Sequence, residues 1–328
     1  MNDPKVSIVI GAYNCGRFIQ ETVNSVVRQT FTDWELVIVD DYSTDDTCKK
    51  IEEIRDERIR IIRLHENSGR PAVARNIGIT ASKGEFVAFL DHDDIWFPSK
   101  LARQIYHFQD KSIAAVGAQA LSLRGHLTPR IYSGKGSKYD DYDYRDFMIK
   151  NHATCSAVLA RKDILLDLKG FGESMDLRFI EDWELWIRIA QVGKFRILKE
   201  PLLFYRVPAD KNHASLEVLE RCFCMLDKHS ASMKLTKNDI NKIKSNINFK
   251  IAINLFRDSN PESRKYFIET IKCSPRFIAK LEACILFMFS ILPGKLIKAL
   301  LLIFFHIRKL TYVDREVRLK SVDILSEK

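Results

Sequence analysis

Four short apolar runs rich in β-branched residues occur in the first 95 residues of the chain. They are VSIVI from Val6, WELVIV from Trp34, IRIIRL from Ile59 and EFVAFL from Glu85. Continuous apolar runs are typical of strands covered on both faces, as in a parallel sheet. Segments with helical spacing lie between them, at 18–29, 46–54 and 70–82. This alternation predicts a doubly wound α/β sheet that is mostly parallel and flanked by helices.

The rest of the chain divides into an irregular part and a helical part. Within residues 100–220 we expect a loop at SKYDDYDYRDF, a strand at TCSAVLA and a helix at EDWELWIRIA. From about Cys222 the pattern is wholly helical. We therefore expect an α/β domain over residues 1–215 and a helical extension over residues 216–328, with a soft boundary and no repeat or linker between them.

A polar cluster follows each of the four predicted strands. In chain order the clusters are GAYN, DDYSTDD, HENSGR and DHDD. Ligands of open parallel sheets bind in the crevice beyond the carboxyl ends of the strands. We therefore expect the four loops to meet at one edge of the sheet and to build a site together.

Charge is distributed unevenly along the chain. The net charge of +9 would suggest nucleic acid as a partner, but from Cys222 onward there are 20 Lys and Arg against 10 Asp and Glu, which leaves 32 against 33 in residues 1–221. The part that carries the polar clusters is therefore close to neutral, which argues against a nucleic-acid groove there. The basic excess of the helical extension needs a separate explanation.

The cysteines and the N-terminus point to a reducing compartment. The seven cysteines form no CxxC pair and no metal-ligand spacing, so neither a disulfide framework nor a zinc site is indicated. The N-terminal MNDPKVSIVIGAYN has an acidic start and a five-residue apolar run, which is too short for a secretory signal. We therefore expect a cytoplasmic protein.

The DHDD cluster supplies oxygen ligands at a tight turn. The carboxylates of Asp91, Asp93 and Asp94 suit a hard divalent cation, Mg²⁺ or Mn²⁺, better than zinc. Such a cation usually completes its shell with water and substrate phosphates, so a diphosphate is implied. The alternative is structural: Asp94 caps a helix and the other two acids form Asx turns.

The first two clusters can hold a nucleoside. Asp40 and Asp41 can accept hydrogen bonds from a base edge or from ribose hydroxyls. Tyr13, beside Asn14, offers an aromatic face for a base. The alternatives are that the two acids only cap the following helix, together with the hydroxyls next to them, and that Tyr13 is an ordinary surface aromatic.

Two acids later in the chain are candidates for a general base. Glu181 and Asp182 open a predicted amphipathic helix, in which Leu185 and Ile189 can face the core. If the start of this helix faces the crevice, one of the acids can take a proton from a hydroxyl. The alternative is that both acids only complement the helix dipole.

Four basic residues are candidates for binding phosphate. Arg70 and Arg75 flank a predicted helix start, where guanidinium groups and backbone amides favour an anion. Arg206 and His213 could close over phosphates. Solvent-facing or structural side chains are the alternative for all four.

Taken together, these motifs resemble glycosyltransferase family 2, whose members have the GT-A fold. The resemblance covers about residues 5–215 and rests on six motifs in order, VSIVIGAYN, VIVDDYSTDDT, NSGRPAVARNIGI, EFVAFLDHDDIWFPSKLARQ, EDWELWIRIA and YR. Each motif alone is weak, but their order and spacing are specific. Many relatives have Pro before the tyrosine motif, whereas Gly11 and Ala12 precede Tyr13 here, which leaves the shape of that loop open.

The resemblance implies an inverting, metal-dependent transfer of a hexosyl or N-acetylhexosaminyl group from a nucleoside diphosphate donor, usually a UDP-sugar, to an acceptor hydroxyl. By motif, the nucleotide-sugar site comprises Ala12, Tyr13, Asn14, Asp40, Asp41, Arg75, Asp91, His92 and Arg206. Tyr13 and Asp41 would contact the base. Asp93 would bind Mn²⁺ or Mg²⁺ with Asp91 near it. Asp182 looks like the base, with Glu181 supporting it.

The composition of the basic extension indicates where in the cell the protein acts. Residues 276–309 hold two charge-free apolar runs, 283–292 and 299–307, split by a Pro-Gly pair and two lysines. A bilayer-spanning helix needs about 20 apolar residues, so neither run crosses alone. Short apolar helices edged with Lys and Arg fit an interfacial anchor on the anionic inner face of the cytoplasmic membrane. A buried helical hairpin or a dimer contact is the alternative.

Such an anchor would place the enzyme beside a glycan or polyprenyl-diphosphate-linked acceptor, as in bacterial relatives that build surface polysaccharide such as O-antigen. Other readings stay open. A DxD phosphatase of the haloacid-dehalogenase type usually carries its nucleophile after the first strand, not the fourth. A sugar nucleotidyltransferase has a glycine-rich N-terminal loop that is missing here. A non-catalytic scaffold that binds nucleotide-sugar and membrane would not need Asp93 and Asp182.

Overall fold

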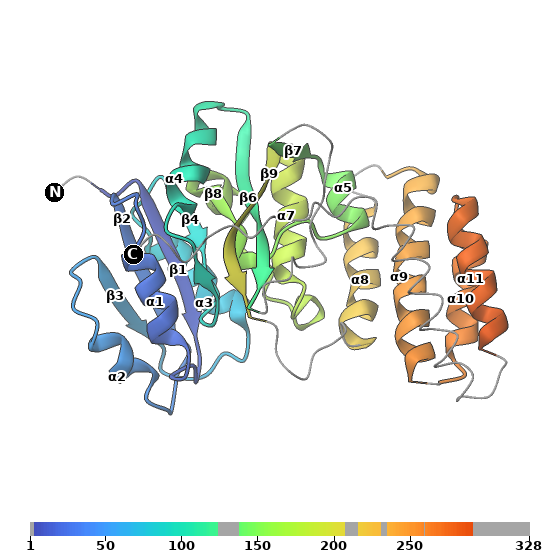
Figure 1. The fold of residues 1–328 in the computed structure, drawn as a ribbon, viewed down its shortest axis with the longest axis horizontal. Coiled ribbons are helices and arrows are strands. Elements are labelled where there is room, and N and C mark those ends of the chain that lie inside the picture. Colours follow the sequence, from blue (N-terminus) through green and yellow to red (C-terminus); the bar gives the residue numbers. More distant parts are fainter. Residues whose placement is uncertain (1–2, 124–137, 207–215, 231–234, 259, 291–328) are drawn as a thin grey trace. The chain divides into compact units, whose positions relative to one another are not determined.

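The computed structural model describes residues 3–123, 138–206, 216–230, 235–258 and 260–290. Two compact units divide the chain, residues 1–243 and residues 244–328. The first unit is built on one sheet, and the described part of the second is helical (Figure 1). The predicted limit of the α/β domain at residue 215 stays a prediction. The helix that follows it belongs to the first compact unit.

The sheet of the first unit contains nine strands. They are β1 (Val6–Ala12), β2 (Trp34–Asp40), β3 (Ile59–Arg63), β4 (Phe86–Phe89), β5 (Ile95–Trp96), β6 (Ile113–Ser122), β7 (Tyr139–Tyr142), β8 (Leu159–Arg161) and β9 (Lys194–Tyr205). Their order is β3-β2-β1-β4-β8-β6-β9-β5, and β7 also pairs with β9. Strands β1 to β4 are parallel, β8 is antiparallel to β4 and β6, and β9 is parallel to β6. The predicted α/β sheet is confirmed.

The helices between the first strands lie close to their predicted spans. They are α1 (Ile19–Val27), α2 (Thr47–Glu52) and α3 (Pro71–Ala81). The later helices of the first unit are α4 (Lys100–Ile105), α5 (Tyr144–Ile149), α6 (Lys162–Asp167), α7 (Glu181–Val192) and α8 (Leu216–Ser230), with 3-10 turns η1 (Tyr106–Gln109), η2 (Cys155–Ala157) and η3 (Met175–Leu177). Helix α9 (Lys237–Arg257) crosses the unit boundary, and α10 (Ser263–Cys273) and α11 (Phe277–Phe289) belong to the second unit.

Two segments differ from the sequence expectation. SKYDDYDYRDF, expected as a loop, forms β7 and the start of α5, because β9 supplies a pairing edge and Asp143 caps the helix through the backbone N–H groups of Arg145 and Asp146. TCSAVLA is a strand only in its second half, since its first half forms η2. Strand pairing with segments that are distant in the chain decided both outcomes. The local composition of a segment does not show whether such a pairing partner exists.

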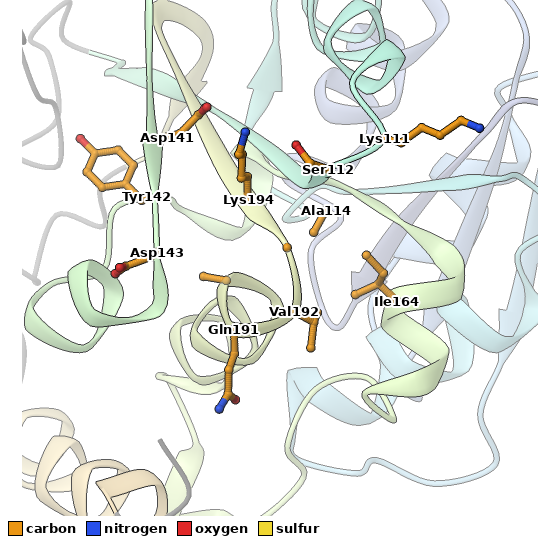
Figure 2. Close-up of a pocket in the computed structure, with 12 residues that line it drawn as sticks. Lys111, Ser112, Ala114, Asp141, Tyr142, Asp143, Ile164, Gln191, Val192 and Lys194 are labelled. Atoms are coloured by element: carbon orange, nitrogen blue, oxygen red, sulfur yellow. The ribbon is translucent and has the colours of Figure 1, made fainter. Parts of the chain in front are cut away.

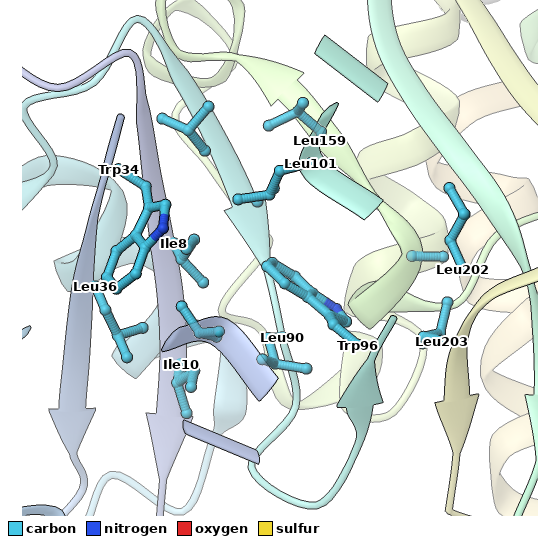
Figure 3. Close-up of a cluster of buried hydrophobic side chains, with 14 of the residues drawn as sticks. Ile8, Ile10, Trp34, Leu36, Leu90, Trp96, Leu101, Leu159, Leu202 and Leu203 are labelled. Carbon is cyan, nitrogen blue, oxygen red and sulfur yellow. The ribbon is translucent and has the colours of Figure 1, made fainter. Parts of the chain in front are cut away.

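One face of the sheet packs against α1 and α4. Ile8 and Ile10 of β1 alternate with residues that face the other way, and Leu36 of β2 lies beside them (Figure 3). Trp96 and Leu101 continue this core toward β9 (Figure 3). All five side chains are at most 2% exposed, so each contributes roughly 1.5–3 kcal/mol of burial free energy.

The other face packs against α3 and α7. Val37 and Val39 of β2 pack with Ala74 of α3. Gly78 allows α3 to approach the sheet closely, because a Cβ there would lie 2.3 Å from Cγ1 of Val9. Close packing fixes the position of α3 over β1 and β2, and its N-terminal turn therefore lies near their carboxyl ends.

Helix α7 is held on the same face by aromatic packing. Trp186 lies 5.9 Å from Phe89, 6.0 Å from Phe171 and 5.8 Å from Phe195, measured between ring centroids. All four rings are at most 2% exposed. This cluster fixes the helix that begins with the predicted acid pair.

A buried charge cluster ties α8 to α7. Glu184 is 1% exposed and accepts hydrogen bonds from Arg188 Nη2 at 2.6 Å and from His229 Nε2 at 2.9 Å. Burial acts to raise the pKa of Glu184, but the bonds from His229 and Arg188 outweigh it and lower the pKa to about 2.

The described part of the second unit has its own small core. Phe256 of α9, Phe267 of α10 and Leu286 of α11 pack together. None of the helices within the described ranges is long and apolar enough to cross a bilayer. Residues 291–309, which complete the expected interfacial anchor, lie outside the described residues.

The low pKa of Glu184 predicts a pH-dependent stability of the first unit. A carboxyl whose folded pKa lies below its unfolded value of 4.5 stabilises the fold fully above that value, and the stabilisation is lost as pH falls toward 2. The shift corresponds to about 3 kcal/mol. We expect Glu184→Gln to lack this contribution, so that the gap in unfolding free energy between wild type and variant narrows from about pH 5 to about pH 3. Urea denaturation across this range measures the gap, and a constant gap would contradict the low pKa.

Candidate active site

The carboxyl ends of the parallel strands meet at one edge. Ala12 at the end of β1 pairs with Asp40 at the end of β2, and Asp40 pairs with Arg63 at the end of β3. The backbone N–H of Asp41 donates to the Ala12 carbonyl oxygen at 2.8 Å. Strand β4 is the other parallel neighbour of β1, so the DHDD loop follows at the same edge. The predicted convergence of the four loops is confirmed.

Arg75 joins this edge to the start of α7. Its Nη2 donates to Asp91 Oδ1 at 2.7 Å, and its Nη1 donates to Glu181 Oε1 at 2.8 Å. The Arg75 side chain is 12% exposed, and its guanidinium lies 5.4 Å from the centre of the Phe171 ring. Burial acts to lower the pKa of Arg75, but the neighbouring anions hold it well above its ordinary value. The buried guanidinium of Arg75 therefore links two motifs that are 90 residues apart in the chain.

Ser156 holds the DHDD loop through hydrogen bonds to two of its residues. Its hydroxyl donates to Asp94 Oδ2 at 2.5 Å and accepts from the backbone N–H of Asp91 at 2.9 Å. Ser156 is fully buried, and its carbonyl oxygen accepts from Trp96 Nε1 at 2.8 Å. The other Asp94 oxygen accepts from the backbone N–H of Arg206 at 2.8 Å. Asp94 thus joins the loop to other segments, and the alternative in which it only caps a helix is wrong.

Two further residues complete the support of the loop. Thr22 of α1 donates its hydroxyl to the His92 carbonyl oxygen at 2.9 Å. Arg206 donates its Nε to the Asp93 carbonyl oxygen at 2.9 Å and its Nη2 to Glu21 at 2.8 Å. The guanidinium of Arg206 therefore positions the loop, while His213 lies outside the described residues.

The electrostatics of the loop favour a cation. Burial raises the pKa of Asp93, and the Asp91 carboxylate adds to the rise while His92 opposes it. Burial and the Asp91 charge also hold the pKa of Asp94 well above its ordinary value. A cation would relieve the repulsion between the acids. Within the described ranges no three His, Cys, Asp or Glu side chains are grouped to hold a metal alone. Two carboxylates with substrate oxygens completing the shell fit Mg²⁺ or Mn²⁺.

The first nucleoside motif has an open aromatic ring. Tyr13 is 46% exposed. Asn14 has a positive φ of 44° and is fixed by Ser43 and Thr44, which bond its backbone N–H and its side-chain oxygen. The Tyr13 ring is therefore carried by a turn of defined shape at the edge of the sheet.

Asp40 and Asp41, the acids of the second motif, do not cap the helix that follows them. Asp41 accepts from the backbone N–H and the hydroxyl of Ser68, both at 2.8 Å. Asp40 is 3% exposed, and its Oδ1 is buried with no hydrogen-bond partner. The N-cap residue of α2 is Asp46, so the alternative in which Asp40 and Asp41 only cap this helix is wrong. An unpaired buried carboxylate oxygen is an acceptor that a donor group of a ligand could satisfy.

The two acids at the start of α7 differ in their surroundings. Glu181 is 5% exposed, and its Oε2 has no hydrogen-bond partner. Asp182 is more accessible, and its Oδ1 accepts from the Trp183 backbone N–H at 2.6 Å. Both lie in the first helical turn, where the helix dipole favours them, and both lie next to the Arg75 bridge.

The sequence analysis missed Ser156 and Cys155. Cys155 is 4% exposed, and burial holds the pKa of its thiol well above the ordinary value, with Asp91, Asp182 and Glu181 adding to the rise. A neutral buried thiol is not a nucleophile. Both residues lie in the segment that we read as a strand, so no local signal pointed to the site.

A pocket lies at the edge of the sheet opposite to the carboxyl ends of β1 to β4. It has a volume of about 520 Å³ and lies where β6 and β9 begin and α7 ends (Figure 2). Among its residues, Asp141 is paired with Arg196, and Asp143 caps α5. It is remote from the carboxyl edge that carries the acids.

Comparison with known proteins identifies the family. The model of "Glycosyl transferase family 2" matches residues 7–167. An uncharacterized glycosyltransferase of Nostoc sp. is 30% identical over 271 residues, which are 80% of this chain and 83% of that protein. The chain belongs to glycosyltransferase family 2.

Two further relatives extend the comparison for this glycosyltransferase. WfaP of Escherichia coli, named as a UDP-Glc:α-D-GlcNAc-diphosphoundecaprenol β-1,3-glucosyltransferase, is 33% identical over 209 residues, 62% of this chain and 78% of WfaP. Residues 1–349 of Staphylococcus aureus TarS, solved with UDP-GlcNAc, give a TM-score of 0.63 at 20% identity, covering 83% of this chain and 82% of that one. The shared architecture is the GT-A fold.

We expect Ser156→Ala to destabilise the first unit. The substitution leaves the Asp94 carboxylate and the Asp91 N–H without their shared partner, at a cost of about 1–3 kcal/mol. Ser112→Ala is the control, since it removes an exposed hydroxyl that also donates to an aspartate, and it should cost less than about 0.5 kcal/mol. Denaturant unfolding measures both. Equal effects of the two variants would remove Ser156 from this role.

Proposed function

We propose that this glycosyltransferase moves a sugar from a nucleoside diphosphate donor, with a UDP-sugar favoured, to a hydroxyl of a glycan or polyprenyl-diphosphate-linked acceptor, in surface polysaccharide synthesis. The Arg75 bridge carries the proposal, because it holds the DHDD loop and the acid pair of α7 around one site. The donor and acceptor printed in the name of WfaP, and the UDP-GlcNAc bound to TarS, support these substrate classes. The group transferred would be a hexosyl or an N-acetylhexosaminyl group.

The donor would lie across the carboxyl edge. Tyr13 is exposed there and offers its ring to the base, and Asp41 offers carboxylate oxygens to the base edge. Asp40, with an unpaired oxygen, can accept from a hydroxyl or amide of the nucleoside. Ala12, Asn14 and His92 supply backbone and side-chain groups of the same loops.

Asp93 and Asp91 would hold Mg²⁺ or Mn²⁺ with the donor diphosphate. When bound, the cation stabilises the charge that develops on the departing diphosphate. The residues themselves keep the loop in place: Ser156 and Arg206 fix its backbone, and Arg75 holds Asp91.

Asp182 would accept the proton of the attacking hydroxyl. It is the more accessible acid of the pair, whereas Glu181 is buried against Arg75. Attack from the face opposite the leaving diphosphate inverts the anomeric centre in one displacement. Glu181 would support the base by keeping the start of α7 joined to the loop.

Two variants should separate the roles of base and cation ligand. Asp182→Asn should leave nucleotide binding nearly intact and lower transfer at least ~10²-fold, because a general base contributes that much. Asp93→Ala should weaken Mn²⁺-dependent UDP binding, measured by calorimetry.

The matched control is Asp163→Asn. Asp163 also lies in a first helical turn and accepts from the next backbone N–H, at 2.8 Å, but on the exposed α6. Transfer by this variant should stay within about 2-fold of wild type. Near-normal turnover of Asp182→Asn, or unchanged Mn²⁺-dependent UDP affinity of Asp93→Ala, would contradict the assignment. Failure of the wild type to transfer or hydrolyse any nucleotide-sugar would favour a non-catalytic scaffold.

We further propose that the helical extension attaches the enzyme to the inner face of the cytoplasmic membrane. Its 20 basic residues against 10 acidic ones from Cys222 onward, and the two short apolar runs, support this location. Within the described residues, Leu281 and Met288 of α11 are 49% and 64% exposed.

Vesicle flotation tests the attachment. Replacing the four basic residues near the second apolar run by Gln, at Lys295, Lys298, Arg308 and Lys309, should weaken binding to phosphatidylglycerol-rich vesicles at least about 10-fold, because each contributes up to about 1 kcal/mol near an anionic surface. Four Lys→Gln changes on α9, at Lys237, Lys242, Lys244 and Lys250, control for total charge. Equal loss in both variants, or equal binding to neutral vesicles, would refute an anchor at this place.

A further inference from the structure

The turn after β2 exposes a second tyrosine at the carboxyl edge of the sheet. Tyr42 follows Asp41 directly and is 51% exposed. Within the part of the chain that the structure describes, its side chain forms no ring stacking, cation–π contact or hydrogen bond. Single exposed aromatic residues are common on protein surfaces, so exposure alone gives Tyr42 no role.

The backbone of Tyr42 is in a strained conformation. Its φ is 66°, in the left-handed region that a bulky side chain rarely adopts. Among the described residues, three other non-glycine residues have a positive φ, namely Asn14, Lys169 and Phe179. Asparagine adopts this region readily, whereas tyrosine does not. Glycine would fit the same turn without a steric cost. The fold therefore carries strain at Tyr42 that a glycine would remove.

Hydrogen bonds on both sides of Tyr42 impose this conformation. Before it, the carboxylate of Asp41 accepts two bonds from Ser68, both at 2.8 Å. After it, the backbone N–H of Ser43 donates to Asp40 Oδ2 at 3.2 Å. Backbone strain persists where the surrounding structure over-determines it, and such positions cluster at ligand sites. The strain at Tyr42 therefore calls for a ligand that uses its ring.

The turn of Tyr42 is bonded to the turn that carries Tyr13. The backbone N–H of Asn14 donates to the Ser43 hydroxyl at 2.9 Å, and the backbone N–H of Thr44 donates to the Asn14 side-chain oxygen at 2.8 Å. The strands that end at these turns, β1 and β2, are parallel neighbours, and such neighbours lie about 4.8 Å apart. Two exposed tyrosine rings thus leave adjacent, linked turns, and both can reach one planar ligand.

We propose that Tyr42 is a second aromatic contact for the base of the donor nucleotide, in addition to Tyr13. The inference rests on the proposed function, in which Asp41 accepts from an N–H at the edge of the base. A base held at Asp41 lies beside the next residue of the chain, which is Tyr42. Stacking of the base on the Tyr42 ring accounts for both the exposure of this ring and the strain of its backbone.

Replacing Tyr42 by glycine separates ligand binding from folding, because it removes the ring and the strain together. Without ligand, Tyr42→Gly should raise the melting temperature of the full chain by about 2–5 °C. Calorimetry in Mn²⁺ should nevertheless show a UDP affinity about 5- to 100-fold lower than that of wild type, as for the loss of one base–aromatic stack. Tyr42→Phe keeps the ring, and its affinity should stay within about 2-fold of wild type.

A control variant and a control ligand isolate the contact with the base. Lys169 is exposed, has a φ of 58° and lies in the turn after α6, outside the nucleoside motifs. Lys169→Gly should therefore raise the melting temperature in the same way and leave UDP affinity unchanged. Dihydro-UDP keeps the ring N–H and both carbonyl groups of uracil, but its saturated ring is neither planar nor aromatic. Wild type should bind it more weakly than UDP, and Tyr42→Gly should bind the two more nearly alike.

The outcomes are distinct. If wild type binds UDP and Tyr42→Gly binds it within about 2-fold as tightly, the role of Tyr42 is overturned and the proposed function stands. An equal loss of affinity for UDP and dihydro-UDP, or an equal loss in Lys169→Gly, also overturns the contact with the base. A loss in Tyr42→Phe as large as that in Tyr42→Gly would assign the contact to the hydroxyl and overturn stacking.

Two further results bear on the premises. A lower melting temperature of Tyr42→Gly would show that the ring stabilises the fold itself, which overturns the argument from strain and the inference with it. If the wild type fails to bind UDP in Mn²⁺ and its melting temperature does not rise, the proposed function itself fails.

Discussion

The arrangement of the site depends on one buried guanidinium group, that of Arg75, which has two anionic partners. Arg75 reaches Asp91 on the loop after β4 and Glu181 at the start of α7, and it is itself fixed by the packing of α3 on the sheet. Removing one partner of a buried ion pair leaves an uncompensated charge, which costs several kcal/mol. The two halves of the site are therefore held at a set separation before any substrate arrives.

The DHDD loop, which carries the proposed cation ligands, is fixed at each of its residues. Ser156 holds Asp91 and Asp94, Thr22 holds the carbonyl of His92, and Arg206 holds the carbonyl of Asp93. These partners come from α1, from η2 and from the residue that follows β9. Such support keeps carboxylates in place even though their mutual repulsion and burial oppose their charged forms.

The first four strands, the three helices between them and the convergence of their loops were predictable, because continuous apolar runs and strand-end polar clusters are local signals. Strand β9 was not, since Lys199 and Pro201 interrupt its apolar pattern and an irregular register with β6 absorbs them. Ser156 was missed for a related reason: its role comes from segments 62 and 65 residues away.

The place of β9 in the sheet has a consequence for synthesis. Strand β5 follows the DHDD loop directly, yet within the described sheet it pairs with β9 alone, about 100 residues later in the chain. While the ribosome is still making residues 100–200, the edge of β5 lacks its neighbour, and Arg206 is not yet available. An incomplete nascent chain should therefore expose the unpaired edge of β5 and lack the contacts that order the DHDD loop, so it should be most prone to aggregate at this stage.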